Sequence, residues 1–500
     1  MRLPAKTTWL LLLALGHLVG LHDGLAWAAE KTAADPGPIA LGSRRELFVD
    51  HFLIEKMDGV RLMLHRPRDE GPVLRFDKPW EGLFCAYCTV IKDGATYRLY
   101  YRGRPTVRPD EVTCYAESTD GIHWTKPELG LFEVNGTKQN NVILAQKKGA
   151  THNFTPFLDT RPDVAAEQRF KAVGGTQAGG GLWAFVSADG IRWRQLQAEP
   201  ILPNETLSSF QYFLDSQNVA FWSPSEEKYL CYFRVTPDGI RRIARTESED
   251  FTHWSEPVLM EYRRPGGEAP LEHLYTNQTH PYFRAPQLYL AIAARFMPGR
   301  KVLTAEQAKA IGVNPKYFGD TSDAVLMSSR GGKFYDRTFL SAFIRPGIGP
   351  QNWVSRTNYP ALNVVPTGPH EMSIYVNQDY AQPTAHLRRY AMRLDGFASA
   401  RAEYEGGELI TRPFTFTGGQ LTINFATSAA GDIRVEIQDA AGKPLPGFAL
   451  ADAREQLGNE IRRVVSWKNG DDVSSLAGQP IRLQFVMRDA DLYSFRFQSK

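Results

Sequence analysis

The sequence predicts an all-β protein made of five repeated units, each with four short strands, followed by a further sheet domain. The first observation is a hairpin phrase that recurs as "STDGIHW" at 118–124, "SADGIRW" at 187–193 and, more loosely, "SEDFTHW" at 248–254. The second is that the same order of strand-like segments surrounds each phrase, at a spacing of about 60 to 80 residues. Five units of four strands are typical of a five-bladed β-propeller.

Each unit contains its strands in the same order. An apolar strand comes first, an aromatic-rich second strand and a third strand follow, and the hairpin leads into a fourth. In the first unit these segments are "FCAYCTVI" (84–91), "TYRLYYRG" (96–103) and "VTCYAES" (112–118). The corresponding three segments of the later units are 153–159, 169–175 and 181–187; 216–222, 228–234 and 241–248; 276–283, 288–296 and 323–329; and 358–365, 371–378 and 385–392.

Turn chemistry gives the recurring phrase a structural role. Gly supplies a positive φ, Asp hydrogen-bonds to the backbone of its own turn, and Trp is expected to pack between neighbouring blades. We therefore assign Asp120, Asp189 and Asp250 to the turns and not to catalysis.

Two segments stand apart from the repeats. The β-rich segment 45–66 precedes the first unit and is a candidate for closing the ring by adding a strand to the last blade. The insertion 301–318 in the fourth unit carries a helix signal, because Thr304 and Gln307 form a capping box ahead of "AEQAKAI" and Gly312 ends it.

The last part of the chain has a different pattern. Apolar and polar residues alternate in 421–427, 433–439, 481–487 and 493–498, which predicts an antiparallel β-sandwich. The predicted parts of the whole chain are a signal peptide (1–28), a linker (29–44), the five-bladed propeller (45–404) and the sandwich (405–500).

The N-terminus predicts export. Arg2 and Lys6 precede the apolar run 9–15, and Ala26-Trp27-Ala28 offers a small-x-small cleavage site. The run is too short and too interrupted for a comfortable membrane span, so a retained anchor is only the alternative. We expect a secreted or periplasmic protein with no membrane span after cleavage.

Charge and cysteine content argue against several classes. The chain has 58 Lys and Arg against 55 Asp and Glu, with no basic run, so a nucleic-acid partner is not expected. Four cysteines are too few for a disulfide scaffold, and their pairing stays open. Cys85 and Cys88 have no second pair or His cluster at zinc spacing. We predict no metal and no cofactor, and leave open a structural divalent ion at the propeller axis.

Polar residues gather on the loops that enter the first strand of each unit, where the funnel of a propeller opens. Aromatic faces stack on sugar rings, amides and guanidinium groups bind hydroxyls, and a pair of carboxylates can cleave a glycosidic bond. The predicted catalytic residues are Glu81, Asp215 and Glu272. The predicted substrate-binding residues are Trp80, His152, Asn153, Asp159, Gln217, Asn277, His280, Trp353 and Arg356.

On the blade pattern of "VIKDGATYRLYYRG" (90–103) and "STDGIHW", the chain resembles the five-bladed propeller glycoside hydrolases, over roughly residues 45–400. These include the invertase and fructanase, the arabinanase and xylosidase, and the mannoside phosphorylase groups, and the trailing sandwich fits the fructanase layout. The resemblance implies an acid at the start of the first strand in blades one to three. Glu81, Asp159 (or His152) and Asp215 stand at the matching places, with Glu272 in blade four.

The catalytic motifs of these families are not reproduced. The Asn-Asp-Pro-Asn-Gly of invertases, the Arg-Asp-Pro and the Glu-Cys are all missing from the expected blades. Fructan hydrolysis is therefore not carried over. A phosphorylase with phosphate held by Arg356, Arg102 or Arg104 stays open.

The expected function is an exported glycoside hydrolase that cleaves an oligo- or polysaccharide with paired carboxylates in the funnel. The alternatives are a non-catalytic carbohydrate-binding propeller and a glycoside phosphorylase, and a sialidase-like enzyme ranks lower. Two carboxylates that converge at about 5–10 Å would favour the enzyme. The sugar, the linkage, retention or inversion, the oligomeric state and the role of the sandwich stay open.

Overall fold

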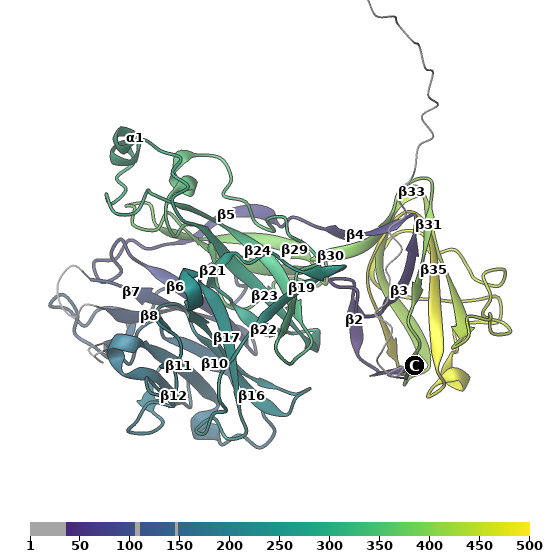
Figure 1. Ribbon diagram of the computed structural model, residues 1–500, viewed down its shortest axis with the longest axis horizontal. Coiled ribbons are helices and arrows are strands. Elements are labelled where there is room, and N and C mark those ends of the chain that lie inside the picture. The colour runs from purple at the N-terminus through teal and green to yellow at the C-terminus, as the bar shows by residue number, and fades with distance from the viewer. Residues whose placement is uncertain (1–36, 106–110, 146–148) are drawn as a thin grey trace, which may run out of the picture. The chain divides into compact units, whose positions relative to one another are not determined.

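The computed structural model describes residues 37–105, 111–145 and 149–500, and this part of the chain is dominated by β-strands (Figure 1). Its strands form six sheets, five with four to seven strands and one with ten. The one α-helix of these residues is α1 (Ala305–Ala310), which has the predicted capping box between Thr304 and Gln307. None of their helices is long and apolar enough to cross a membrane. The predicted signal peptide lies outside the described residues.

Five of the sheets lie apart from the ten-stranded one. The first contains β6 (Ala86–Asp93), β7 (Thr96–Gly103), β8 (Val112–Ser118) and β9 (Val142–Ala145). The second contains β10 (Thr155–Leu158), β11 (Phe170–Thr176), β12 (Gly181–Ser187), β13 (Arg194–Gln195) and β14 (Leu202–Pro203). The third contains β15 (Val219–Ser223), β16 (Lys228–Val235), β17 (Arg242–Ser248) and β18 (Val258–Leu259).

The fourth and fifth sheets are more elaborate. The fourth contains β19 (Glu261–Arg264), β20 (Gly267–Glu268), β21 (His273–Thr276), β22 (Thr279–Tyr282), β23 (Ala285–Met297), β24 (Thr321–Ser329) and β25 (Phe334–Asp336). The fifth contains β26 (Tyr359–Pro360), β27 (Val365–Pro366), β28 (Glu371–Gln378), β29 (His386–Arg393) and β5 (Arg68–Arg75).

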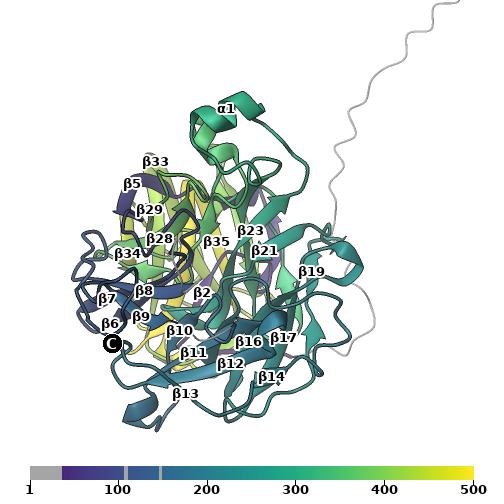
Figure 2. The ribbon, with the colours of Figure 1, turned by 90° about the vertical axis from the view of Figure 1, so that its left-hand side faces the viewer.

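These five sheets form a propeller-like ring (Figure 2). The strands nearest the axis contact one another in chain order: β6 contacts β10, β10 contacts β15, β15 contacts β22, β23 contacts β26, and β26 contacts β6. Backbone hydrogen bonds connect β6 to the segment that follows β26. Val90 N donates to Leu362 O at 3.1 Å, and Leu362 N donates to Cys88 O at 2.8 Å.

The strand that completes the fifth sheet is β5, which pairs antiparallel with β29. The sequence pointed to 45–66 for this role, and there the structure differs. β2 (Arg45–Leu47), β3 (Ile54–Asp58) and β4 (Val60–Leu64) pair instead with strands of the ten-stranded sheet. β5 is an exposed edge strand with the polar sequence "RDEGPVLR", so it lacks the apolar pattern that marks a strand in sequence.

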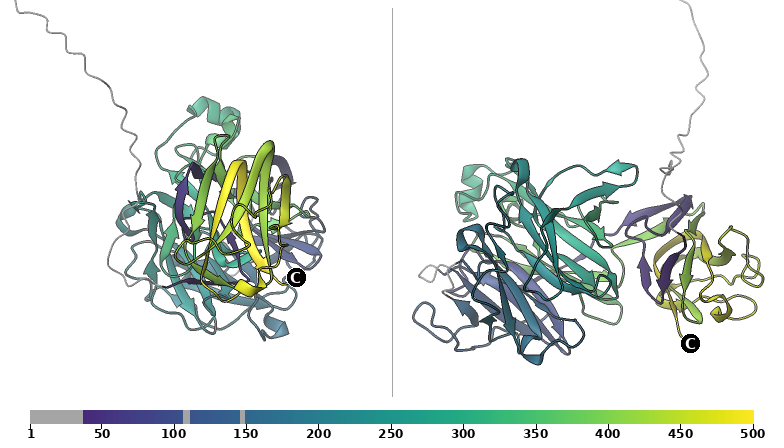
Figure 3. Two further views of the ribbon diagram at one scale, coloured as in Figure 1. Left: turned by 90° about the vertical axis from the view of Figure 1, so that its right-hand side faces the viewer. Right: turned by 60° about the horizontal axis from the view of Figure 1, so that its bottom comes forward.

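The ten-stranded sheet combines both ends of the described chain (Figure 3). Besides β2–β4 it contains β1 (Ile39–Gly42), β30 (Ala398–Ala402), β31 (Gly407–Thr411), β32 (Phe414–Phe416), β33 (Gln420–Asp439), β34 (Asn459–Val464) and β35 (Ile481–Gln498). Its core joins Leu41 and Phe48 to Phe414, Trp467 and Phe495. Residues 39–64, placed in the linker and propeller from sequence, thus pair and pack with the C-terminal strands.

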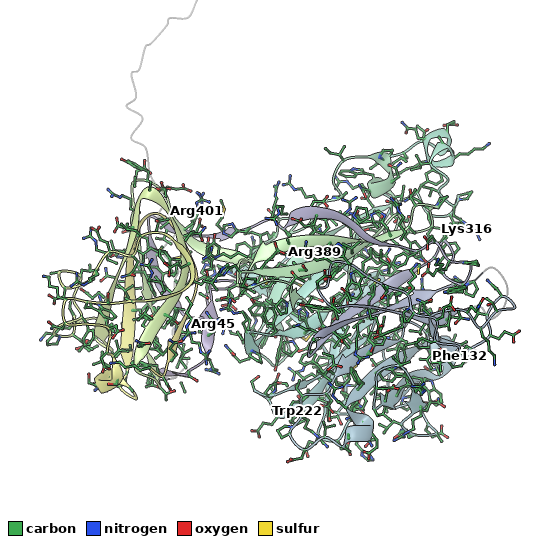
Figure 4. All side chains as sticks on the ribbon, turned by 180° about the vertical axis from the view of Figure 1, so that it is seen from behind. Arg45, Phe132, Trp222, Lys316, Arg389 and Arg401 are labelled. Carbon is green, nitrogen blue, oxygen red and sulfur yellow. The ribbon has the colours of Figure 1, made fainter. Side chains whose placement is uncertain are left out.

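A buried carboxylate connects this sheet to the ring. Asp395 accepts hydrogen bonds from Tyr282 Oη at 2.8 Å, Ser494 Oγ at 2.6 Å and Asn424 Nδ2 at 3.1 Å. Arg45, labelled in Figure 4, adds an ion pair at 3.4 Å. A fully buried charge needs such partners, because an unpaired one would be strongly destabilising.

The recurring hairpins have the structural role expected from their sequence. In the first, Ser118 Oγ accepts from the backbone N–H of Gly121 at 2.9 Å, and Asp120 Oδ1 accepts from those of Ile122 and His123 at 2.8 Å. The same bonds recur around Asp189 and Asp250.

The hairpin aromatics contact the neighbouring sheet of the ring. Trp124 lies 5.9 Å from the ring of Tyr375 in the fifth sheet, and Trp193 lies 6.4 Å from that of Tyr100 in the first. In the third hairpin Phe251 occupies the glycine position with φ of 71°, and it lies 5.5 Å from Phe157 of the second sheet. A left-handed conformation is costly for Phe, and burial of its ring between sheets offsets that cost.

Gly190→Ala tests whether these turns hold the sheets together. A Cβ at Gly190 would lie 2.6 Å from the hydroxyl of the buried Tyr100, and φ is +74°. We expect the free energy of unfolding to fall by about 2–4 kcal/mol, from left-handed strain and overpacking together. Urea denaturation followed by tryptophan fluorescence measures this loss.

The matched control is Gly94→Ala. Gly94 also has a positive φ, +59°, but open space around its Cβ position. Strain alone should cost about 1 kcal/mol there. Equal losses in the two variants would show that the contact with Tyr100 contributes nothing.

Candidate active site at the mouth of the ring

One end of the ring collects side chains from every sheet. In an antiparallel sheet, the start of the first strand, the end of the second and the start of the third lie at the same end; Ala86, Arg102 and Thr113 are aligned in this way in the first sheet. We call this end the mouth. The described loops that reach it include 76–85, 149–154, 177–180, 204–218, 236–241, 298–320, 345–358 and 379–385.

His152 lies between two carboxylates at the mouth. Its Nδ1 is 2.8 Å from Glu111 Oε2, and its Nε2 faces Asp215 Oδ1 at 3.6 Å. Glu111 also accepts a hydrogen bond from the backbone N–H of Asn153 at 3.1 Å. Burial lowers the pKa of His152, but the two neighbouring carboxylates outweigh it, so that this pKa lies above its usual value.

Three neighbouring side chains contact the carboxylate of Asp215. It accepts a hydrogen bond from Tyr212 Oη at 2.7 Å and forms an ion pair with Arg234 at 3.1 Å. Burial favours the neutral acid, yet His152, Arg234 and Tyr212 together hold the pKa of Asp215 well below its ordinary value. Asp215 therefore remains ionised at neutral pH.

Three arginines surround the ring of Tyr275, and we call them the arginine cluster. The guanidinium carbons of Arg234, Arg241 and Arg356 lie 4.5, 5.2 and 5.5 Å from the centre of this ring. Arg234 is the last residue but one of β16, Arg241 precedes β17, and Arg356 precedes β26.

A fourth arginine braces the mouth from the first sheet. Arg102 lies over Tyr87 at 4.6 Å, donates to Asn153 Oδ1 at 2.8 Å and donates to Tyr380 Oη at 3.2 Å. These contacts join the first, second and fifth sheets. Arg102 is thus occupied largely by protein partners.

Asp320 is an acid of the opposite kind from Asp215. It directly precedes β24, and its Oδ1 is buried without a hydrogen-bond partner. Burial raises the pKa of Asp320, and the Ser355 hydroxyl and the charges of Arg356 and Arg241 only partly counteract it. The mouth therefore holds one aspartate whose pKa is lowered and one whose pKa is raised.

The structure places Glu81 in a buried structural network. Glu81 is fully buried, pairs with Lys126 at 2.7 Å, and accepts from Tyr101 Oη at 2.7 Å and from Lys78 N at 2.8 Å. Its neighbour Trp80 donates to Asn141 Oδ1 at 2.7 Å. None of these partners belongs to the surroundings of His152 or to the arginine cluster.

Two further predicted acids are held inside ion pairs of the sheets. Glu272 binds Arg295 at 2.9 Å and Arg337 at 2.8 Å. Asp159 follows β10 at the end opposite the mouth and binds Lys171 at 2.5 Å and Tyr229 Oη at 2.6 Å.

The remaining predicted binding residues divide between the axis and the rim. Gln217 donates to Thr89 Oγ1 at 2.9 Å. Asn277 donates to Tyr232 O at 3.4 Å. Buried His280 accepts from Val364 N, and burial lowers its pKa to about 4. Trp353, by contrast, is 36% exposed on the loop before Arg356.

The structure thus brings His152, Asn153, Asp215 and Arg356 together from the sequence predictions. The catalytic and substrate-binding predictions were drawn from loops that enter first strands. They therefore missed Glu111, Arg241 and Asp320 before third strands and Arg234 near the end of a second strand. Alternation of strand direction is the signal that would have found them.

The described residues hold no group of three or more His, Cys, Asp or Glu side chains that could bind a metal ion. Cys85, Cys88, Cys114 and Cys231 are free and buried.

No protein-family model matches the chain. The "Uncharacterized protein Rv1502" of Mycobacterium tuberculosis (strain ATCC 25618 / H37Rv) is 28% identical over 130 residues, which are 25% of this chain. The matched part spans 38% of the length of this curated relative.

Solved structures that are similar to this chain include one described as "Glycoside hydrolase", with 11% identity and a TM-score of 0.42 over 66% of this chain and 92% of that one. A fructofuranosidase from Schwanniomyces occidentalis has 10% identity and a TM-score of 0.38 over 88% of this chain and 99% of that one. Similarity at this level assigns no activity to this chain.

The electrostatics of His152 give a prediction for its titration. In Asp215→Asn, we expect the pKa of the His152 imidazole to fall, because one of the two carboxylates that favour the imidazolium is lost. NMR titration of the histidine ring protons measures it, with His280 near 4 as an internal reference.

The raised pKa of His152 also predicts how the free energy of unfolding changes with pH. Because the folded-state pKa of His152 is raised, its contribution to stability is full below the unfolded pKa and is lost as pH rises through the folded value.

For the NMR titration, Asp163→Asn, at an exposed site, is the control and should leave the pKa of His152 unchanged. A His152 pKa that is the same in Asp215→Asn and the native protein would contradict this account.

Proposed function

We propose that the five ring sheets are the blades of a five-bladed propeller and that the ten-stranded sheet is a sandwich built from residues 39–64 and 398–498. The closed order of contacts from β6 back to β26 supports the first assignment. The shared core of Phe48, Phe414 and Phe495 supports the second. We further propose that residues 1–28 direct export, on the sequence evidence of Arg2, Lys6 and the apolar run that follows.

We propose that the mouth is the active site of a glycoside hydrolase acting on an oligo- or polysaccharide. The observation that carries this proposal is the pair Asp215 and Asp320, two carboxyl groups at one mouth whose environments shift their pKa values in opposite directions. Glycosidic cleavage needs such a division of roles between an acid and an ionised carboxylate.

In this mechanism Asp320 holds a proton and delivers it to the glycosidic oxygen as the bond between that oxygen and the anomeric carbon breaks. Ionised Asp215 faces the developing positive charge on the anomeric carbon. It either attacks that carbon, with later hydrolysis by water, or takes a proton from an attacking water molecule. In both cases water supplies the new hydroxyl. His152 is a positioning residue that holds Asp215 in place.

Exposed aromatic side chains near the carboxylates fit the same function. Tyr212, which donates to Asp215, is 46% exposed, and Trp353 is 36% exposed. Aromatic faces at a rim offer stacking surfaces for sugar rings on either side of the cleaved bond.

A glycoside phosphorylase is the second candidate. The arginine cluster favours it, because guanidinium groups bind phosphate with paired hydrogen bonds. In that reaction inorganic phosphate would replace water as the acceptor of the glycosyl group.

Asp215→Asn and Asp320→Asn test the proposed pair. We expect each to reduce release of reducing ends from the cleaved polysaccharide by at least about 100-fold, because each removes a group that acts at the reacting bond. The purified protein is screened on plant, algal and microbial polysaccharides, with and without phosphate. Turnover that requires phosphate would instead identify the phosphorylase.

Glu81→Gln is the matched control, since Glu81 is a buried carboxylate of the first sheet. We expect it to lower the melting temperature while turnover per folded molecule is kept. Full activity of both aspartate variants would rule out the pair. So would loss of activity in Glu81→Gln alone, with its fold intact.

The pH dependence gives a separate check on Asp320. Because the acid must be protonated, activity should fall as pH rises through the raised pKa of Asp320. With a substrate whose leaving group needs no protonation, such as a nitrophenyl glycoside, the fall in activity at alkaline pH should disappear. The Asp320→Asn variant should also regain turnover on this substrate. An unchanged alkaline limb with such a substrate would assign it to another group.

A further inference from the structure

Two of the three arginines of the arginine cluster lack an ion-pair partner among the residues the structure describes. Arg234 is paired with Asp215, but neither Arg241 nor Arg356 has an ion pair with any residue the structure describes. Arg356 lies over the rings of tyrosines, and Arg241 lies over the rings of Tyr275 and Phe296. Arg241 also contacts His273 Nδ1 at 3.4 Å. Contact with an aromatic face does not cancel a charge.

Unused hydrogen-bond donors accompany this charge. Arg234 is only 3% exposed, yet its Nε and Nη1 are buried without a hydrogen-bond partner. Buried donors without acceptors are rare in folded proteins and call for an explanation.

An anionic ligand would pair with the two unpaired arginines. Its oxygens would accept from the half-buried guanidinium groups of Arg241 and Arg356, and its charge would lower the repulsion among the three arginines. Arg234 contacts Asp215 and Tyr275 together, so the ligand's charged group would lie next to the carboxylate proposed to act on a sugar.

We infer that the mouth selects a sugar that carries an anionic group, a uronate or a sulfated residue, and binds that group at the arginine cluster. This inference rests on the proposed function for the placement of the sugar ring beside Asp215. The positive charge and the unused donors of the cluster do not depend on it.

Isothermal titration calorimetry on the wild-type protein tests the inference. The probes are an oligogalacturonate, its neutral methyl ester, a chondroitin sulfate tetrasaccharide and inorganic phosphate. We expect at least one charged oligosaccharide to bind about tenfold or more tightly than the methyl ester, and to bind more weakly as salt rises. The uronate and sulfate arms tell the two charged groups apart.

Arg356→Gln and Arg241→Gln supply the second part of the test, with two variants in case one fails to fold. Each should abolish the preference for the charged probe and keep the melting temperature within a few degrees. Arg264→Gln, at an exposed arginine of the fourth sheet, is the control and should bind as the wild type does. Equal affinity for charged and neutral probes, or unchanged binding in both variants, would overturn the inference.

Analysis of each sample for cleavage after the titration separates this inference from the proposed function. Tight binding of a charged probe without cleavage supports the anionic ligand and counts against hydrolysis. Cleavage of neutral glycans with no charge preference supports hydrolysis and overturns the inference. Binding of phosphate alone overturns it as well and favours the phosphorylase.

Discussion

The structure depends on closing a ring whose first and last members are far apart in the chain. Each ring sheet is small, and an open row of them would leave unpaired strand edges and exposed apolar faces. Pairing of β5 with β29 and the Leu362 contact with β6 close the row. The mouth exists only in the closed ring, because no sheet contains it alone. Its contributors are Arg102, His152, Asp215 and Arg234, Tyr275 and Asp320, and Arg356 and Tyr380 from successive sheets.

The parts of the fold that were predictable from sequence are those fixed by local chemistry. The hairpins around Asp120 and Asp189 were predictable because the turn needs a left-handed residue and a side-chain acceptor within four positions. The ring-closing strand was not, because β5 is polar and is stabilised by pairing with residues more than 300 positions away. The apolar segment 45–66 has a stronger strand pattern, and it pairs with a different sheet.

The residues of the candidate site also differ in how far sequence alone predicts them. Asp215 and Arg356 were found because they lie on loops that enter first strands. Glu81 and Glu272 have the same position in sequence, but Lys126 and Arg337, distant in the chain, bind them inside the sheets. Sequence alone does not reveal such partners. Asp320 was missed because its role depends on burial at the end of a long insertion.

The two assemblies also impose an order of events on a chain that emerges from its N-terminus. Asp69 of β5 binds Arg388, 319 positions away, and Arg45 of β2 binds Ser494, 449 positions away. The early strands therefore have no partners to pair with until the C-terminal segment has left the ribosome. Such delayed pairing is expected to slow folding, because contacts between distant residues form only after the entropy of closing a long loop has been lost. Late completion of both assemblies is thus a consequence of one arrangement, in which the first strands of the polypeptide pair with its last.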